Sequence, residues 1–122
     1  MKHIKSVLQT DWDRCFFNIC GNPPTQIHHV MHGPDRRKAE EDGLIIYVCR
    51  TCHDLIHFDK DRSGQTDRAL KRLAQLKWEE RWKTKNTTQV TLKSVKEVED
   101  YMAEQAKRAR LAWMARYGRN YL

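Results

Sequence analysis

Two closely spaced pairs of cysteines constrain the fold of this chain more than any other feature. Cys15 and Cys20 have four residues between them, Cys49 and Cys52 have two, and 28 residues separate the pairs. Such spacings let four thiolates approach one tetrahedral ion, and the glycine directly after Cys20 helps the first turn to close. The sequence therefore predicts a structural Zn²⁺ at these four cysteines.

The composition supports a metal staple rather than a large apolar core. Of 122 residues, 39% are hydrophobic and 32% are charged, and small domains with thin cores often need such a staple. The first residues contain no apolar run long enough for a signal peptide or a membrane span. We therefore expect a cytoplasmic chain without membrane partners, whose thiols are reduced and available to a metal.

Five histidines gather in the same part of the chain, between Ile27 and Phe58. Their positions are His28, His29, His32, His53 and His57. His53 and His57 stand four residues apart, so in a helix they would project from one face and could hold one metal ion. Two alternatives stay open. The histidines could be structural or solvated, or Cys49 and Cys52 could join His53 and His57 in a finger-like site that leaves Cys15 and Cys20 aside.

The elements around the histidines follow the order strand, loop, strand, helix. A short strand-like run, Thr25–Met31, carries His28 and His29, and the β-branched and aromatic run Gly43–Cys49 indicates a second strand. The segment after Cys52 is the expected helix. The loop between the strands holds Arg36, Arg37 and Lys38, which are candidate DNA phosphate contacts or solvated residues.

The second half of the chain is strongly basic. Residues 1–59 hold 7 Lys/Arg against 8 Asp/Glu, whereas residues 60–122 hold 16 against 8. Residues 59–65 are polar and include Gly64, which indicates a loop, and Thr66 is a candidate cap for a helix to about Lys83. A second helix is expected between a Ser94 capping box and Gly118. The basic charge suits a phosphate backbone, although solvated helix faces have the same composition.

The two helices carry apolar residues at helical spacing. The first stripe is Leu70, Leu73, Ala74 and Trp78, and the second is Val95, Val98, Met102, Ala106, Ala109 and Trp113. Tryptophans at such spacing are more often core than nucleic-acid contacts. The polar connection 86–93 between the helices has some β character in Gln89–Leu92.

These linked motifs resemble the HNH, or ββα-metal, nuclease family over residues 15–58. The resemblance depends on the cysteine pairs, the His28-His29 pair, the run from Leu44 to Cys49-x-x-Cys52-His53, and His57. The stretch from His28 to His53 also looks like small phage-encoded HNH proteins, including RecA-dependent recombination nucleases, and the closing Tyr117–Leu122 is similar to the end of such proteins. A phage origin would place the chain in the host cytoplasm.

The resemblance implies a fold, a reaction and partners. The fold is α+β: a zinc-stapled ββα-metal core, residues 1–60, with a basic helical extension, residues 61–122, packed on it. The reaction is metal-dependent hydrolysis of DNA phosphodiester bonds, which leaves 5′-phosphate and 3′-hydroxyl ends. The implied partners are DNA and possible recombination or phage DNA-processing proteins.

The family roles carry over to four histidines. His29 becomes the general base, and His28, His53 and His57 become ligands of one catalytic divalent ion, Mg²⁺, Mn²⁺ or Zn²⁺. A neutral imidazole can take a proton from water at neutral pH, and a metal with three protein ligands keeps positions open for a phosphate. The role of His32 stays open: it could support a metal ligand, contact a phosphate, or lie at the surface.

Two features of the sequence, Gly43 and the direct adjacency of His28 and His29, bear on whether the family mechanism can operate here. Gly43 stands where many relatives have the asparagine that orients the base, so another residue must orient it or activity is reduced. Adjacent strand residues face opposite ways, so His28 and His29 share a site only if the strand bulges or ends there. The rival readings are a zinc-stapled DNA-binding or adaptor module without turnover, and a redox or zinc-finger regulator.

Overall fold

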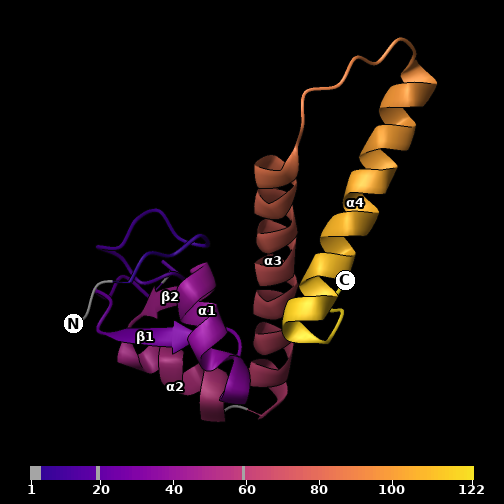
Figure 1. The fold of residues 1–122 in the computed structure, drawn as a ribbon. Coiled ribbons are helices and arrows are strands. Elements are labelled where there is room, and N and C mark those ends of the chain that lie inside the picture. The colour runs from indigo at the N-terminus through magenta and orange to yellow at the C-terminus, as the bar shows by residue number, and fades with distance from the viewer. Residues whose placement is uncertain (1–3, 19, 59) are drawn as a thin grey trace. The chain divides into compact units, whose positions relative to one another are not determined.

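The computed structural model describes residues 4–18, 20–58 and 60–122, with backbone alone at 58 and 60–63. Figure 1 shows an α+β fold in which helices surround a two-stranded sheet or follow it in the chain. The α+β class predicted from the sequence is confirmed at this level. The elements are β1 (Gln26–His29), a 3₁₀ turn η1 (Gly33–Asp35), α1 (Arg36–Asp42), β2 (Ile45–Val48), α2 (Arg50–Phe58), α3 (Lys60–Asn86) and α4 (Val95–Tyr117).

The chain divides into two compact units, residues 1–74 and residues 75–122. The first unit holds every cysteine and the histidines of the predicted site. The boundary expected after residue 60 falls at the start of α3 and stays a prediction. No helix in the described ranges is long and apolar enough to cross a membrane.

The sheet consists of β1 and β2, which pair antiparallel. His28 lies opposite Ile46, and His29 lies opposite Ile45. All four residues of β2 are buried, as expected for a strand that is covered on both faces. Both α1 and α2 contact β1, so this strand has a helical neighbour available to each of its two histidines.

An N-terminal segment, residues 5–16, covers the outer edge of β2. In an isolated two-stranded sheet, that edge would leave backbone N–H and C=O groups without partners. Here the edge groups of residues 43, 45 and 47 are hydrogen-bonded by the N-terminal segment. The bonds are Val7 N to Gly43 O at 2.9 Å, Ser6 Oγ to Ile45 O at 2.6 Å, Tyr47 N to Gln9 Oε1 at 2.8 Å and Phe16 N to Tyr47 O at 2.8 Å.

The basic residues expected in a loop between the strands belong instead to a helix. Arg36, Arg37 and Lys38 form the first turn of α1. The segment 36–42 is rich in good helix formers and is closed by Gly43, but seven residues are too short to show a helical period. Pro34 in the preceding turn is suited to a helix start.

Gly43 has a backbone reason to be glycine. It ends α1 in the left-handed conformation, with φ of 73°, which glycine adopts without steric cost. A Cβ at this position would lie 3.0 Å from the Lys5 carbonyl oxygen and 3.1 Å from Val7 Cγ1. The N-terminal segment therefore packs where an asparagine side chain would begin.

The loop predicted at residues 59–65 is wrong for residues 60–65, and Asp59 lies outside the described residues. α3 begins at Lys60 and continues through Gly64 and Thr66 to Asn86, so Thr66 caps nothing. A glycine inside a helix costs only about 1 kcal/mol relative to alanine, and the surrounding Lys, Arg and Gln residues favour the helix. Asp67 also hydrogen-bonds with His32 in the first unit, which adds tertiary support.

α4 begins and ends where the sequence predicts. The Ser94 side chain accepts the Glu97 N–H at 3.1 Å, and Gly118 closes the helix with φ of 76°. The predicted apolar stripe does lie on this helix, but its first half is not buried, because Val95 and Met102 are 75% and 64% exposed. Helical spacing selects a face but does not say how far a neighbour extends along it. The buried face is Gln105, Ala109, Trp113 and Tyr117.

Within the second unit, the tryptophans are mainly core residues. Trp113 is fully buried, and its ring centroid lies 5.6 Å from that of Trp78. Trp82 is partly buried. Residues 87–93 form no strand, although β character was expected at Gln89–Leu92, because these exposed residues have no strand to pair with.

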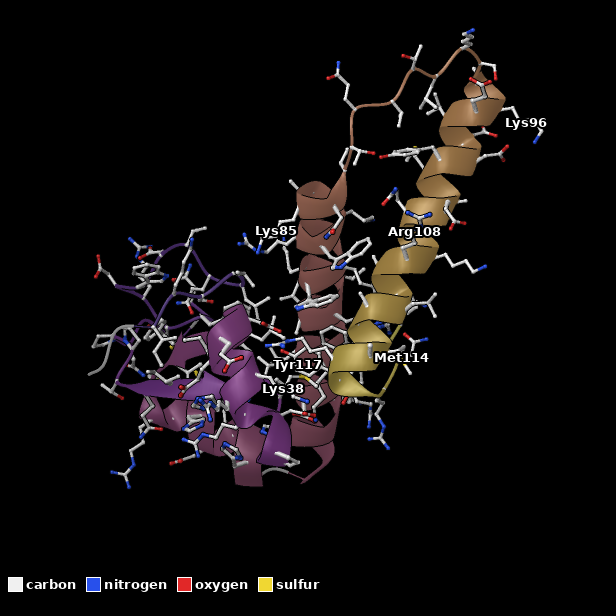
Figure 2. All side chains as sticks on the ribbon, viewed as in Figure 1. Lys38, Lys85, Lys96, Arg108, Met114 and Tyr117 are labelled. Atoms are coloured by element: carbon white, nitrogen blue, oxygen red, sulfur yellow. The ribbon has the colours of Figure 1, made fainter. Side chains whose placement is uncertain are left out.

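Basic side chains project from α4, as Figure 2 shows for Lys96 and Arg108. Each pairs with an acidic residue one turn away, Lys96 with Asp100 at 3.0 Å and Arg108 with Glu104 at 3.2 Å. Exposed pairs of this kind contribute little to stability, about 0–1 kcal/mol each.

Candidate metal centre

The four cysteines converge on one site in the first unit. Their sulfur atoms all lie within 4.8 Å of one another, and Cys15, Cys49 and Cys52 are buried. The second pair sits at the start of α2, where backbone N–H groups point toward the sulfurs. Cys49 N donates to Cys15 Sγ at 3.4 Å and Cys52 N donates to Cys49 Sγ at 3.4 Å. Four cysteines so placed could hold a structural metal such as zinc.

Hydrogen bonds also prepare one of these sulfurs to be a thiolate. Burial alone would raise the pKa of the Cys49 thiol, but donors from Cys52 and Asn22 lower this pKa to about 6. Asn22 Nδ2 lies 3.7 Å from Cys49 Sγ. Burial raises the pKa of Cys15 and of Cys52 above the ordinary thiol value. A divalent cation would overcome this cost, because it binds the deprotonated sulfur.

Three histidines form a second convergent group next to the sheet. One ring nitrogen each of His28, His53 and His57 lies within 4.8 Å of the others. His53 Nε2 and His57 Nε2 are 3.0 Å apart, and the His28 ring centroid is 5.3 Å from each of the other two. The finger-like alternative is therefore not the grouping found, because His53 and His57 group with His28 and the four cysteines group together.

His28 is the buried member of this group. It is 1% exposed, and its Nε2 atom has no hydrogen-bond partner among the residues that the structure describes. A buried polar atom without a partner costs roughly 1–3 kcal/mol. A metal ion bound to Nε2 would remove this cost, so the donor set fits a divalent cation.

The secondary structure accounts for this convergence. His28 points from β1 toward α2, and His53 and His57 share one face of α2 at helical spacing. His53 Nδ1 hydrogen-bonds with the side-chain oxygen Oε1 of Gln26, two residues before His28 on β1. This bond fixes the His53 ring so that Nε2 faces the cluster. Metal-binding histidines are commonly oriented in this way by a hydrogen bond to their other ring nitrogen.

The electrostatics favour neutral imidazoles, the form that binds metals. Burial, with added repulsion from the neighbouring imidazoles His53, His32 and His57, lowers the pKa of His28 to about 3. Burial and the nearby His57 lower the pKa of His53 as well. Protons therefore compete weakly with a cation at His28 near neutral pH.

His29 lies beside this group and is held by a carboxylate. Its Nε2 is 2.7 Å from Glu40 Oε1 on α1. β1 ends at His29, so the strand does end where sharing of one site by His28 and His29 requires it. Both line a cavity of about 210 Å³, whose lining is Ile27, His28, His29, His32, Gly33, Arg36, His53 and His57.

The structure separates the three basic residues that were expected to act together. Arg36 lines the cavity. Arg37 is turned outward, with its side chain 91% exposed and its Nε 3.5 Å from Glu41. Lys38 lies 3.5 Å from the Asp35 carboxylate. Only Arg36 is placed to meet a ligand in the cavity.

Sequence reasoning missed three further residues around the cluster. They are Glu40 and Gln26, which hold histidines, and Asp67, whose Oδ1 lies 2.9 Å from His32 Nε2. Lys71 Nζ contacts the other oxygen of Asp67 at 2.5 Å. The i,i+4 spacing of Asp67 and Lys71 is a local pattern that the sequence shows. The pairing of Asp67 with His32, 35 residues away, leaves no local signal.

No family model, curated protein or solved structure gives a significant match to this chain.

Proposed function

We propose that this chain is a metal-dependent DNA endonuclease of the HNH, or ββα-metal, type. One observation carries the proposal: His28, buried and without a partner at Nε2, meets two helical histidines beside a carboxylate-held His29 in one cavity. The order β1, β2, α2 supports the proposal, because it brings a strand histidine pair against a helix histidine pair. The thiolate cluster at the start of α2 would hold that helix in place.

His28, His53 and His57 would hold the divalent cation. When bound, that cation would polarise a phosphate and stabilise the negative charge on the leaving 3′ oxygen. Arg36 lines the same cavity as these three histidines. The guanidinium of Arg36 would bind a phosphate oxygen there.

His29 would act as the general base. Its Nε2–H donates to Glu40, which leaves Nδ1 as the acceptor nitrogen. Nδ1 takes a proton from water as the water oxygen attacks phosphorus. The bond from phosphorus to the 3′ oxygen then breaks, and that oxygen takes a proton from solvent. Glu40 would orient His29, which is the role that the resemblance gives to an asparagine at residue 43, and it would also stabilise the imidazolium that forms.

Nicking of supercoiled plasmid with Mg²⁺ or Mn²⁺ tests this proposal. We expect the wild type to nick DNA, and His29→Ala to lose roughly 10²–10⁴-fold in rate while it still binds the cation. Arg37→Ala, which changes an exposed neighbour of Arg36, is the matched control and should nick like the wild type.

Two results would contradict the proposal. Equal nicking by the wild type and His29→Ala would remove the assigned base. Tight DNA binding without cleavage by any divalent ion would identify a binding or adaptor module instead.

A further inference from the structure

A second pair of candidate ligand atoms faces His28 from another part of the first unit. His32 follows β1, and Asp67 lies in the first half of α3. Ring nitrogens of His28 and His32 and a carboxylate oxygen of Asp67 all lie within 4.8 Å of one another. The His32 ring centroid lies 5.5 Å from that of His28. We propose that His28, His32 and Asp67 form an alternative ligand set of the same centre, which takes hard divalent cations such as Mn²⁺, while His28, His53 and His57 take Zn²⁺.

The two pairs that flank His28 have nearly the same geometry. His53 Nε2 and His57 Nε2 are 3.0 Å apart, and His32 Nε2 and Asp67 Oδ1 are 2.9 Å apart. Two ligand atoms about 2.1 Å from one ion lie about 3.0 Å apart when their bonds to it form a right angle. The His32–Asp67 pair is hydrogen-bonded in this structure, and the atoms of each pair are also spaced as two adjacent ligands of one ion would be.

The shared imidazole makes the two sets exclusive. A neutral imidazole has a single acceptor nitrogen, so His28 binds one ion at a time. An ion on His28 is completed either by His53 and His57 or by His32 and Asp67. The centre therefore holds one ion, and the identity of that ion decides which pair is engaged.

The donor atoms give the sets different preferences. Three imidazoles suit Zn²⁺ and similar late transition-metal ions, whereas a carboxylate oxygen adds affinity for harder ions such as Mn²⁺. Asp67 is well prepared for this role. Lys71 Nζ lies 2.5 Å from the second carboxylate oxygen, Oδ2, and so holds the carboxylate in place.

This inference rests on the proposed metal centre but not on DNA cleavage, so binding is the readout. Chain with zinc at the thiolates would be titrated with Mn²⁺ by electron paramagnetic resonance and with Zn²⁺ by competition against a chromophoric chelator. We expect Asp67→Asn and His32→Asn to weaken Mn²⁺ binding about 10–100-fold and Zn²⁺ binding less than about threefold. His53→Ala should show the reverse preference.

Asp54→Asn is the matched control. It removes one negative charge next to His53, on the exposed side of α2, without removing a candidate ligand. It should change neither affinity by more than about twofold. Circular dichroism and the count of thiolate zinc would show that each variant is folded.

Several outcomes would overturn the inference. It fails if Asp67→Asn and His32→Asn leave Mn²⁺ binding unchanged, or weaken both ions equally. A wild type that binds neither ion beyond the thiolate zinc would overturn the metal centre as well. A chain with the expected selectivity but without nicking activity would contradict only the proposed function.

Discussion

His29 Nε2 and Glu40 Oε1 lie 2.7 Å apart, which joins the last residue of β1 to the middle of α1. This pair gives the proposed base a fixed tautomer, although residue 43 is glycine. If His29 acts as the proposed base, a carboxylate in this position would also stabilise the positive charge on the imidazolium.

Replacement of Glu40 therefore tests how the base is oriented. We expect Glu40→Ala to lower kcat for plasmid nicking about 10–100-fold, with KM nearly unchanged, because Glu40 acts through His29. Glu40→Gln keeps an oxygen acceptor and should recover part of the loss. Glu41→Ala, an exposed neighbour on α1, is the control. Equal kcat values for Glu40→Ala and Glu41→Ala would rule out this role.

Substitution of Gly43 should destabilise the fold. An L-residue in the left-handed region costs roughly 1–2 kcal/mol, and a Cβ at Gly43 would also meet the Lys5 carbonyl. We expect Gly43→Ala to lower the free energy of unfolding by at least about 2 kcal/mol in urea titrations. Gly118 has the same backbone conformation, but a Cβ added there would have no neighbouring atom within 4 Å. Gly118→Ala should therefore lower the free energy of unfolding by only about 1 kcal/mol. Equal losses would mean that the close approach at Gly43 contributes nothing.

Removal of the thiolate ligands should unfold the first unit. Cys49→Ser loses a ligand whose pKa is already lowered to about 6, and binding of a structural zinc is coupled to folding. We expect zinc loss and a much lower Tm. Asn22→Ala removes only the donor to Cys49 Sγ and should weaken zinc binding about tenfold. A Cys49→Ser chain with unchanged Tm would contradict a structural zinc at this cluster.

The buried imidazole of His28 predicts a pH dependence. Without an ion at the histidines, burial and the neighbouring imidazoles lower the pKa of His28 to about 3, against 6.5 for an exposed imidazole. Between these values the unfolded chain binds the extra proton, so stability is full above pH 6.5 and falls as the pH is lowered. The loss approaches roughly 1.4 kcal/mol per pH unit. His28→Leu should flatten this dependence in urea titrations, and an unchanged slope would refute the assignment.

The two neighbouring arginines of α1 should differ in their contribution to DNA binding. Arg36 lines the cavity, whereas Arg37 is turned outward and lies near Glu41. We expect Arg36→Ala to weaken binding of a DNA duplex about tenfold in fluorescence anisotropy, which is ~1.4 kcal/mol. Arg37→Ala should weaken it less than about twofold. The opposite order would show that phosphate is bound outside the cavity.

Short-range patterns predicted much of the fold, and they singled out the residues of the cysteine cluster and of the histidine cluster. The cysteines of each pair are close in the sequence, and so are His53 and His57. These side chains therefore stay near one another in any fold that forms α2. The caps of α4 are local for the same reason, since Ser94 and Gly118 act on their own helix.

The remaining features depend on contacts between distant segments. Glu40 reaches His29 only because α1 packs against β1, and Asp67 reaches His32 only because α3 continues through Gly64. Neither contact leaves a period or motif in the sequence. The sequence predicts a loop at Arg36 because α1, with seven residues, is too short to show a helical pattern.

The N-terminal segment that lies along β2 has a consequence for handling the protein. Ile45–Val48 is a continuous run of β-branched and aromatic residues, and an unprotected edge of such a strand is a template for intermolecular pairing and amyloid-like aggregation. Ser6, Val7 and Gln9 occupy that edge. They cover this strand edge, so removal of the residues before Cys15 should expose it and promote self-association through β2.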